Sequence, residues 1–414
     1  MHGIIFHAFF MKIEKLKKIA PLFIYQGINA LFPVFLFPIV LHKIGPTEFA
    51  KIVSSESIVI FVLTCVIYGF DIRGVSLIIK NSCSYWRSSY YFSIIFYSRC
   101  IVFFISLLII TPIVFYYKRE ILWEFIIWTF WPLSYIFLNF YYYHAKKNVD
   151  KLIYFYCIPR ILCFLFLLFI MDESSTSIFI VFSIVLCYFS SGVLGFFYLR
   201  KSISLVYVEF FTCLRFLKRE FYIFWGNISV FFYRGTNLIF FNFFPLSAQE
   251  VSSYAIVEKT IKALQASVLP ISQFFTPNMI SEVFKSDEKR KIIIRYSLKS
   301  FSVGLAVALV SVVPLVMLWR FWGLSPDYMF FYIIMISAVP ASSFNYMAGS
   351  IGLNSIGYSK QFALILSFVG CFGAVIGFLG IFFKGGLGAS IAYGLSEVLL
   401  LIFIVISLKK VSFK

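Results

Sequence analysis

The chain consists of long, uninterrupted runs of apolar residues that are separated by short charged segments. A run of about 20 such residues can cross the hydrocarbon core of a bilayer as a helix. The residues are 61% hydrophobic and 13% charged, whereas soluble domains have about 45–50% apolar and about 25% charged residues. The chain cannot cover its surface with polar groups, so most of its solvent must be lipid. This excludes a soluble globular domain, and it also excludes a disordered chain.

The apolar runs predict twelve transmembrane helices and leave no room for a soluble catalytic domain. Because the runs are continuous rather than alternating, they exclude a membrane barrel made of strands. We therefore expect an all-α integral membrane protein with about twelve transmembrane helices. The predicted segments are roughly 19–41, 52–70, 90–117, 121–143, 152–171, 178–199, 221–244, 251–275, 292–319, 329–351, 362–383 and 387–408.

Lysine and arginine residues are distributed unevenly among the connections between these segments. Of the 36 basic residues, 23 lie in the N-terminal segment, the even-numbered connections or the C-terminal tail, and six lie in the odd-numbered connections. Cytoplasmic loops of membrane proteins carry an excess of Lys and Arg. The bias predicts that both termini are cytoplasmic, and it supports an even number of spans.

The longest connection lies near the midpoint of the chain, at residues 200–220. It contains the stretch 203–217, which we interpret as an interfacial helix because it is too short to be a span. Two halves of six helices each would then flank this linker. The predicted boundaries are 1–18 for a cytoplasmic N-terminal segment, 19–199 for the first half, 200–220 for the linker, 221–408 for the second half and 409–414 for a cytoplasmic tail.

A weak internal repeat supports the division into halves. A shift of 205 residues aligns Phe49 and Ala50 with Tyr254 and Ala255, at the start of the second helix of each half. Equivalent helices keep their orientation when an even number of spans separates them, so the halves would be parallel repeats. Parallel repeats place a substrate path at the interface between the halves. We therefore expect a central cavity between two parallel six-helix halves.

Several charged residues lie inside the predicted spans, where a charge costs about 2.5–3.5 kcal/mol on insertion scales. The basic ones outnumber the acidic ones, which suggests an anionic ligand or a watery cavity. The basic residues are Arg99, Arg160, Arg234, Lys259, Lys262, Arg295 and Lys299, and the acidic residues are Glu56, Glu124, Glu258 and Glu397.

Polar neighbours single out some of these residues as candidates for the transport path. Arg234 shares one helical face with Asn237, and Asn29 marks a similar polar face on the first helix. Arg160 follows Pro159, where a broken helix would expose backbone carbonyls. The residues expected to bind substrate are Arg99, Arg160, Arg234, Lys259, Lys262, Asn29 and Asn237.

The sequence leaves two roles open for the acidic residues, structural ion pairing and ion coupling. Glu258 and Lys262 lie four residues apart in the favourable order and fit a simple ion pair. Glu397 fits structural pairing and ion coupling equally well. We expect Glu56, Glu258 and Glu397 to serve in ion coupling or gating.

Nothing in the sequence predicts catalysis, a cofactor or a metal. The eight cysteines form no CxxC pair, and the four histidines lie at the N-terminus or in loops. A membrane glycosyltransferase would need an acidic metal motif, and the chain has no Asp-x-Asp sequence. The formal net charge of +18 could suggest nucleic acid, but the basic residues lie in short runs between apolar segments. We expect a transporter rather than an enzyme. Its expected partner is the lipid bilayer, and we expect it to bind no nucleic acid.

Several short motifs, in their order and spacing, resemble the polysaccharide flippases of the MOP superfamily, in particular the Wzx-type O-antigen translocases. The resemblance covers almost the whole chain, with Ala50 where the family often has glycine. The motifs are LHKIGPTEFA at 41–50, Tyr68-Gly69-Phe70, Tyr233-Arg234 with Asn237, Tyr254-Ala255, Glu258-Lys259, and the prolines Pro270 and Pro277.

The resemblance implies a flippase of the bacterial inner membrane. Such a protein moves an undecaprenyl-diphosphate-linked oligosaccharide, the O-antigen repeat unit, from the cytoplasmic to the periplasmic leaflet by alternating access. It implies a role in lipopolysaccharide biosynthesis, with a polysaccharide polymerase and a chain-length regulator as partners. The alternative is a multidrug or small-cation exporter of the same superfamily. Cationic drugs favour an acidic cavity, and the basic surplus inside the spans argues against that alternative.

Overall fold

The computed structural model describes residues 2–146, 148, 150–286, 288–321 and 326–410, so most of the predicted tail at 409–414 lies outside the described residues. The described residues are helical almost throughout. Eight helical stretches are long and apolar enough to cross a membrane. Two of these, Ile24–Lys80 and Ser359–Lys409, contain a chain reversal and therefore two passes each. The fold class is thus confirmed as an all-helical, multi-pass membrane protein.

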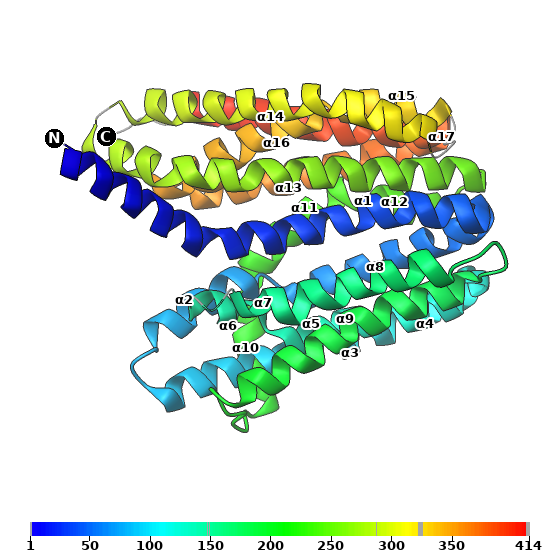
Figure 1. Ribbon diagram of the computed structural model, residues 1–414, viewed down its shortest axis with the longest axis horizontal. Coiled ribbons are helices and arrows are strands. Elements are labelled where there is room, and N and C mark those ends of the chain that lie inside the picture. Colours follow the sequence, from blue (N-terminus) through cyan, green and yellow to red (C-terminus); the bar gives the residue numbers. More distant parts are fainter. Residues whose placement is uncertain (1, 147, 149, 287, 322–325, 411–414) are drawn as a thin grey trace.

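The first half of the chain folds into one bundle, which lies below in Figure 1. Its elements are α1 (His2–Ile67), α2 (Phe70–Lys80), α3 (Tyr85–Tyr117), the short η1 (Arg119–Ile121), α4 (Leu122–Trp128), α5 (Phe130–Leu138), α6 (Phe140–Ala145), α7 (Asp150–Leu152), the π-helical turn η2 (Ile153–Cys157), α8 (Ile158–Ile170) and α9 (Ser177–Arg200).

The second half forms the upper bundle of Figure 1. It follows α10 (Phe210–Arg219) and consists of α11 (Phe221–Arg234), α12 (Thr236–Phe241), α13 (Ala248–Lys285), α14 (Lys289–Phe321), α15 (Pro326–Met335), α16 (Ala338–Asn345), the π-helical η3 (Tyr346–Leu353) and α17 (Ser359–Lys410).

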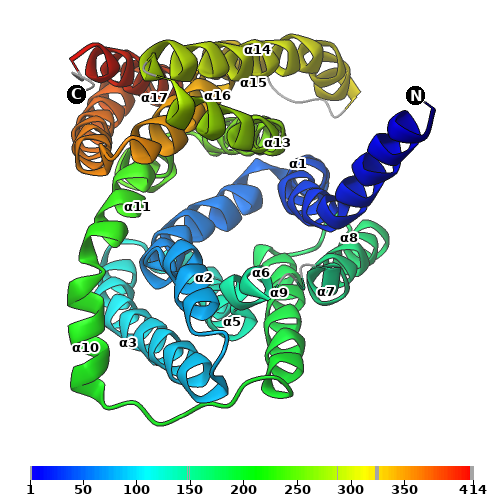
Figure 2. The ribbon, with the colours of Figure 1, turned by 90° about the vertical axis from the view of Figure 1, so that its left-hand side faces the viewer.

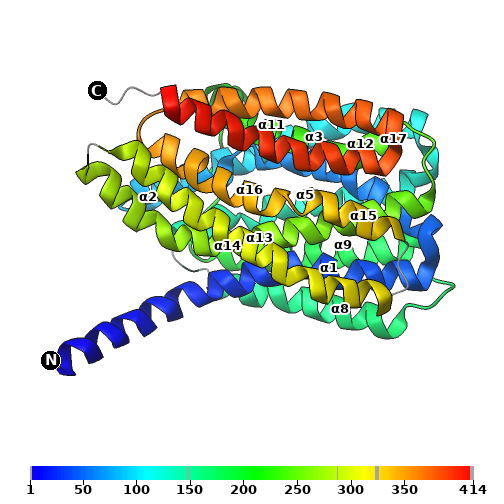
Figure 3. The same ribbon diagram turned by 90° about the horizontal axis from the view of Figure 1, so that it is seen from above.

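Glycines make the two tight reversals. Gly45 divides α1 with φ 78°, and Gly385 divides α17 with φ 56°. Both values lie in the left-handed region, which glycine enters without a steric penalty. Pro46 follows Gly45, and its fixed φ suits the first turn of the next helix. Figure 3 shows the two arms of α17 side by side, with the start of α1 and the end of α17 at one end of the molecule. We call this end the terminal end and the opposite one the far end.

Each of the twelve predicted spans falls on helical segments, but some spans are broken. The second span ends at Tyr68 and Gly69, which both have positive φ, and α2 continues from there. The fourth span is interrupted at Asn139, with φ 45°. α13 is long enough to cross a membrane but is not among the eight apolar stretches, and it carries the charged residues Glu258, Lys259 and Lys262.

The connection between the bundles runs along the outside of the molecule, as Figure 2 shows. After the end of α9 at Arg200, only Phe210–Arg219 of it is helical, which is shorter than the expected 203–217 stretch. The extended part before α10 is held to α3, where Ser93 accepts a hydrogen bond from the backbone of Val206 at 2.8 Å. We propose that residues 200–220 act as the linker between the halves.

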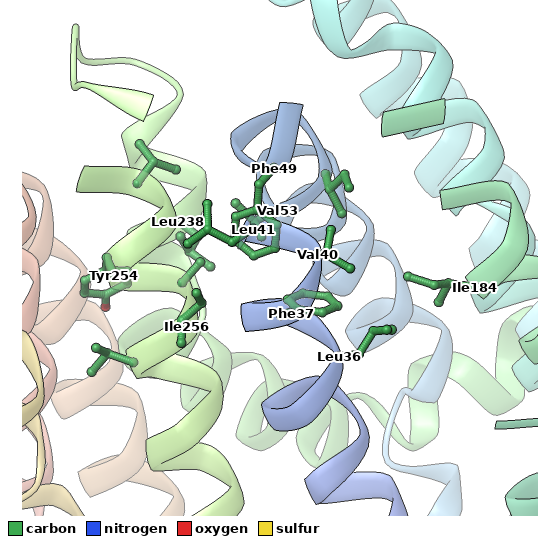
Figure 4. Close-up of a cluster of buried hydrophobic side chains, with 14 of the residues drawn as sticks. Leu36, Phe37, Val40, Leu41, Phe49, Val53, Ile184, Leu238, Tyr254 and Ile256 are labelled. Atoms are coloured by element: carbon green, nitrogen blue, oxygen red, sulfur yellow. The ribbon is translucent and has the colours of Figure 1, made fainter. Parts of the chain in front are cut away.

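A buried apolar cluster joins the two bundles. It combines residues of both arms of α1, such as Phe37 and Phe49, with Tyr254 and Ile256 of α13 (Figure 4). Phe49 and Tyr254, the pair aligned by the 205-residue shift, are both fully buried in this cluster. Because α1 and α13 pack together here, polar residues on the same two helices are brought together across the boundary.

Candidate substrate cavity

A cavity of about 420 Å³ lies between the bundles. Its volume is within the range of about 300–1,000 Å³ that is usual for ligand sites. Six of the ten residues predicted from the sequence line it: Asn29, Glu56, Arg160, Glu258, Lys259 and Lys262. The other lining residues are Gln26, Ala30, Pro33, Phe37, Ile60, Trp131, Tyr188, Ala263, Ala266 and Leu269.

Arg160 is the most deeply buried cation of this cavity, with 2% of its surface exposed. The π-helical turn η2 and Pro159 bring it to the cavity at the start of α8. Its guanidinium lies 3.6 Å from the ring centroid of Tyr156 and 4.7 Å from that of Tyr188. Ring faces attract a cation, and more strongly so where water is excluded.

The hydrogen bonds of Arg160 leave its Nε without a partner among the described residues. Its Nη1 donates to Oδ1 of Asn29 at 2.5 Å. No carboxylate pairs with Arg160 among the described residues. A guanidinium has five N–H donors in a planar fork that matches carboxylate and phosphate oxygens. Arg160 is therefore a fixed cation that can accept an anionic ligand.

Lys259 and Glu56 form an ion pair across the boundary between the bundles. The Lys259 ammonium lies 2.8 and 2.7 Å from the two carboxylate oxygens of Glu56. Their side chains are only 11% and 7% exposed. Lys259 also lies 4.4 Å from the ring centroid of Phe37. Glu56, expected as a gating group, thus joins the second arm of α1 to α13.

A second pair in the cavity lies entirely on α13. Lys262 donates to Glu258 at 2.9 Å, with the i,i+4 spacing that the sequence suggested. The Glu258 side chain is 3% exposed and that of Lys262 is 37% exposed. With both pairs formed, the carboxylates neutralise two of the three cations of the cavity. The charge that remains belongs to Arg160.

Arg234 and Glu397 form a third pair, but inside the second bundle. Nε of Arg234 lies 2.6 Å from Oε1 of Glu397, and the amide of Asn345 donates to Oε2 at 3.0 Å. Glu397 is fully buried, and the side chain of Arg234 is 30% exposed. Arg234 lines a separate cavity of about 140 Å³ between α11, α13, α16, η3 and α17. This pair holds helices of one bundle together and lies outside the central cavity.

The two remaining predicted residues lie within the bundles. Arg99 is fully buried and bonds Asp71 at 2.8 Å, and the Tyr135 hydroxyl donates to the same carboxylate. Asn237 donates to the hydroxyl of Tyr254 at 2.8 Å. Each side chain thus bonds a neighbouring helix of its own bundle, while Nε and Nη1 of Arg99 are buried without a hydrogen-bond partner among the described residues.

Sequence reasoning did not identify the partners of the arginines. Asp71 lies just past the predicted end of the second span and therefore looked like a loop residue. Tyr156 precedes Arg160 by four residues, which is one helical turn, so this spacing could have flagged it. Tyr188 comes from α9, and no feature of the sequence distinguishes it among 26 tyrosines.

No protein-family model and no curated protein matches the sequence. Three solved structures resemble the fold. An inward-facing multidrug resistance transporter of the MATE family, in the MOP superfamily, is 12% identical, with a TM-score of 0.72 over 94% of this chain and 96% of that chain. The inward closed conformation of the lipid II flippase MurJ is 14% identical, with a TM-score of 0.65 over 94% of this chain and 87% of that chain.

The third structure is a MATE protein in complex with MaL6, which is 13% identical with a TM-score of 0.56 over 95% of this chain and 96% of that chain. The first two are a transporter and a flippase by name, and neither is an enzyme. At such low identity the likeness concerns the fold alone. The two-bundle arrangement described above is therefore similar to the fold of these MATE and MurJ structures.

Proposed function

We propose that this protein is a flippase that carries a lipid-linked oligosaccharide diphosphate across the membrane by alternating access. The observation that supports this most directly is Arg160, a buried guanidinium in the cavity between the bundles with no carboxylate partner among the described residues. Diphosphate oxygens match the guanidinium fork and would form charge-assisted hydrogen bonds with it. Lys262 is partly exposed and lies in the same cavity, so it could bind the same group.

An apolar groove beside the cavity supports a lipid-linked substrate. The groove has a volume of about 460 Å³ and lies between α1, α13 and α14. Leu31, Val34, Leu264 and Val310 line it, and Ala263 lines both the groove and the cavity. An isoprenoid chain could lie against this apolar surface while its diphosphate is in the polar cavity. The family resemblance favours undecaprenyl diphosphate with an O-antigen repeat unit as the cargo.

The proposed setting is the bacterial inner membrane, with both termini in the cytoplasm. The support is the excess of basic residues in the N-terminal segment, the even-numbered connections and the tail. Reporter fusions placed after Lys118 and after Lys384 should both read periplasmic. A cytoplasmic reading after Lys384 alone would mean that the spans of the second half are miscounted.

The proposed role of Arg160 can be tested in liposomes that contain the purified protein and a fluorescent polyprenyl diphosphate oligosaccharide. Arg160→Ala should lower the affinity for this lipid roughly 10- to 150-fold, because a hydrogen bond to a charged group contributes about 1.5–3 kcal/mol. Arg160→Lys should retain part of the activity, since lysine keeps the charge but loses the bidentate geometry. Arg119→Ala is the matched control, because Arg119 is an exposed arginine outside the cavity.

Unchanged flipping by a correctly folded Arg160→Ala protein would remove this residue from the substrate site.

One observation favours the alternative of a multidrug or small-cation exporter, because Glu56 and Glu258 also line the cavity. The same liposomes can therefore be loaded with a lipophilic fluorescent cation. We expect no protein-dependent transport of the cation, since both carboxylates already pair with lysines. Cation export without lipid flipping would replace the flippase proposal.

A further inference from the structure

α14 presents a basic face to the surroundings of the molecule. Lys291, Arg295 and Lys299 follow one another at intervals of four residues and therefore share one side of the helix. All three are exposed, as is Leu298 between them, with 53% of its surface. A surface hollow of about 730 Å³ lies along this face, and its described lining residues also include Glu288, Arg290, Ile294 and Ser302.

Carboxylates neutralise only part of this face. Lys291 pairs with Glu288 at 2.5 Å, and Arg295 pairs with Glu282 at the end of α13. Lys299 lies 5.0 Å from the ring centroid of Tyr296 and forms no ion pair with a carboxylate of the described residues. Of Lys291, Arg295 and Lys299, the innermost cation is thus the one without a carboxylate partner in the part of the chain that the structure describes.

The position of Lys299 makes an unpaired charge costly. It lies ten residues into α14, which is about 15 Å along the helix axis at a rise of about 1.5 Å per residue. The surrounding stretch, Lys289–Val313, is apolar enough to be a membrane span. Side chains of a helix lean toward its N-terminus, so Lys299 leans toward the terminal end. This is the direction in which a lysine extends its ammonium to reach lipid headgroups.

We propose that the phosphate of an anionic phospholipid from the surrounding bilayer binds to this face of α14. Lys299 and Arg295 would donate to the phosphate oxygens, while Ile294 and Leu298 contact the acyl chains. Basic pockets on membrane helices attract anionic headgroups in this way. The site is separate from the central cavity, because the two share no lining residue. The assignment therefore does not depend on the proposed flippase activity.

Native mass spectrometry of the purified full chain tests the assignment, with phosphatidylglycerol or phosphatidylcholine added stepwise. The wild-type protein should retain phosphatidylglycerol in preference to phosphatidylcholine. Lys299→Gln should weaken this retention about tenfold, as expected for the loss of one hydrogen bond to a charged group. Lys299→Arg should preserve it. Lys360→Gln, which changes an exposed lysine at the start of α17, should have no effect.

Three results would overturn the assignment. The first is equal retention of the two lipids by the wild-type protein. The second is unchanged retention by Lys299→Gln when circular dichroism shows that the variant is folded. The third is displacement of phosphatidylglycerol by an equimolar polyprenyl diphosphate, which would assign the face to the transported lipid. Because the readout is lipid retention, a failed flipping assay would leave the assignment of this face intact.

Discussion

The ion pair between Glu56 and Lys259 is the charged contact in the cavity that connects the two bundles. Glu56→Gln removes one of its charges at nearly constant volume. Breaking a buried pair in this way costs about 3–5 kcal/mol, because the remaining charge is left uncompensated. Lys259 is 11% exposed and lines the cavity, so we take the lower limit of about 3 kcal/mol. This corresponds to a roughly 150-fold shift toward a conformation in which the bundles have separated, since about 1.4 kcal/mol is a factor of ten.

A cysteine at position 252 reports on this separation. Ser252 is fully buried, and its hydroxyl donates to the backbone oxygen of Ala248 on its own helix at 2.6 Å and lies 3.2 Å from the backbone oxygen of Pro46 across the bundle boundary. In a background without the native cysteines, Ser252→Cys should react slowly with a maleimide, because only molecules with separated bundles expose it. Glu56→Gln should accelerate labelling in detergent micelles by up to about 150-fold, following the shift in population.

The pair on α13 provides the matched control. Glu258→Gln also removes a buried carboxylate from the same cavity, but its partner Lys262 is on the same helix. This variant should leave the labelling rate close to that of the parent. Exchanging the charges, with Glu56→Lys and Lys259→Glu together, should restore slow labelling. Equal acceleration by Glu56→Gln and Glu258→Gln would refute the role of the cross-bundle pair, as would no acceleration by Glu56→Gln.

Two further predictions concern the packing of the second bundle, and both can be measured as the midpoint of thermal unfolding in detergent. Gly370→Ala should destabilise the protein by about 1–3 kcal/mol, because the new Cβ would lie 2.4 Å from the backbone oxygen of Ser229 and force a shift between helices. Gly226→Ala is its control, since the added methyl group meets nothing within 4 Å. Arg234→Ala should destabilise the protein by about 3–5 kcal/mol, because it leaves a buried carboxylate unpaired. Glu397→Gln should cost less, since Arg234 is 30% exposed and can be hydrated.

Much of the fold follows from the sequence, because a bilayer restricts what a chain can do. Long apolar runs must become helices when no water can satisfy the backbone. The sequence also contains turn residues at both reversals: Gly45 is followed by a proline, and Gly385 is followed by a second glycine. The helix breaks inside the spans could not be predicted from turn residues. Asn139 adopts a left-handed conformation in the middle of an apolar run, and its local sequence contains no other turn signal.

The ion pairs between distant residues could not be predicted from the sequence. Arg160 and Arg234 both looked like cations inside spans, but of these two only Arg234 has a carboxylate partner among the described residues. That partner, Glu397, is 163 positions away in the chain, so helical spacing cannot indicate it. Glu258 and Lys262 could be anticipated because their pairing is local. Which charges remain free for a ligand therefore depends on how the helices pack, and this separates Arg160 from the others.

The arrangement of charges in the cavity favours moderate affinity, which suits a transporter better than tight binding of its substrate. The proposed diphosphate substrate would meet one cation without a carboxylate partner among the described residues, Arg160, and would compete with Glu56 and Glu258 for the two lysines. This competition would limit the affinity, so the cargo could be released. The membrane potential could supply the drive, since an outward-moving negative charge gains about 2.3 kcal/mol per 100 mV. The cavity would then need only to lower the energy barrier that the charged group meets in crossing the membrane. A substrate that takes Lys259 from Glu56 would at the same time loosen the contact between the bundles, so binding and opening would be coupled through one lysine.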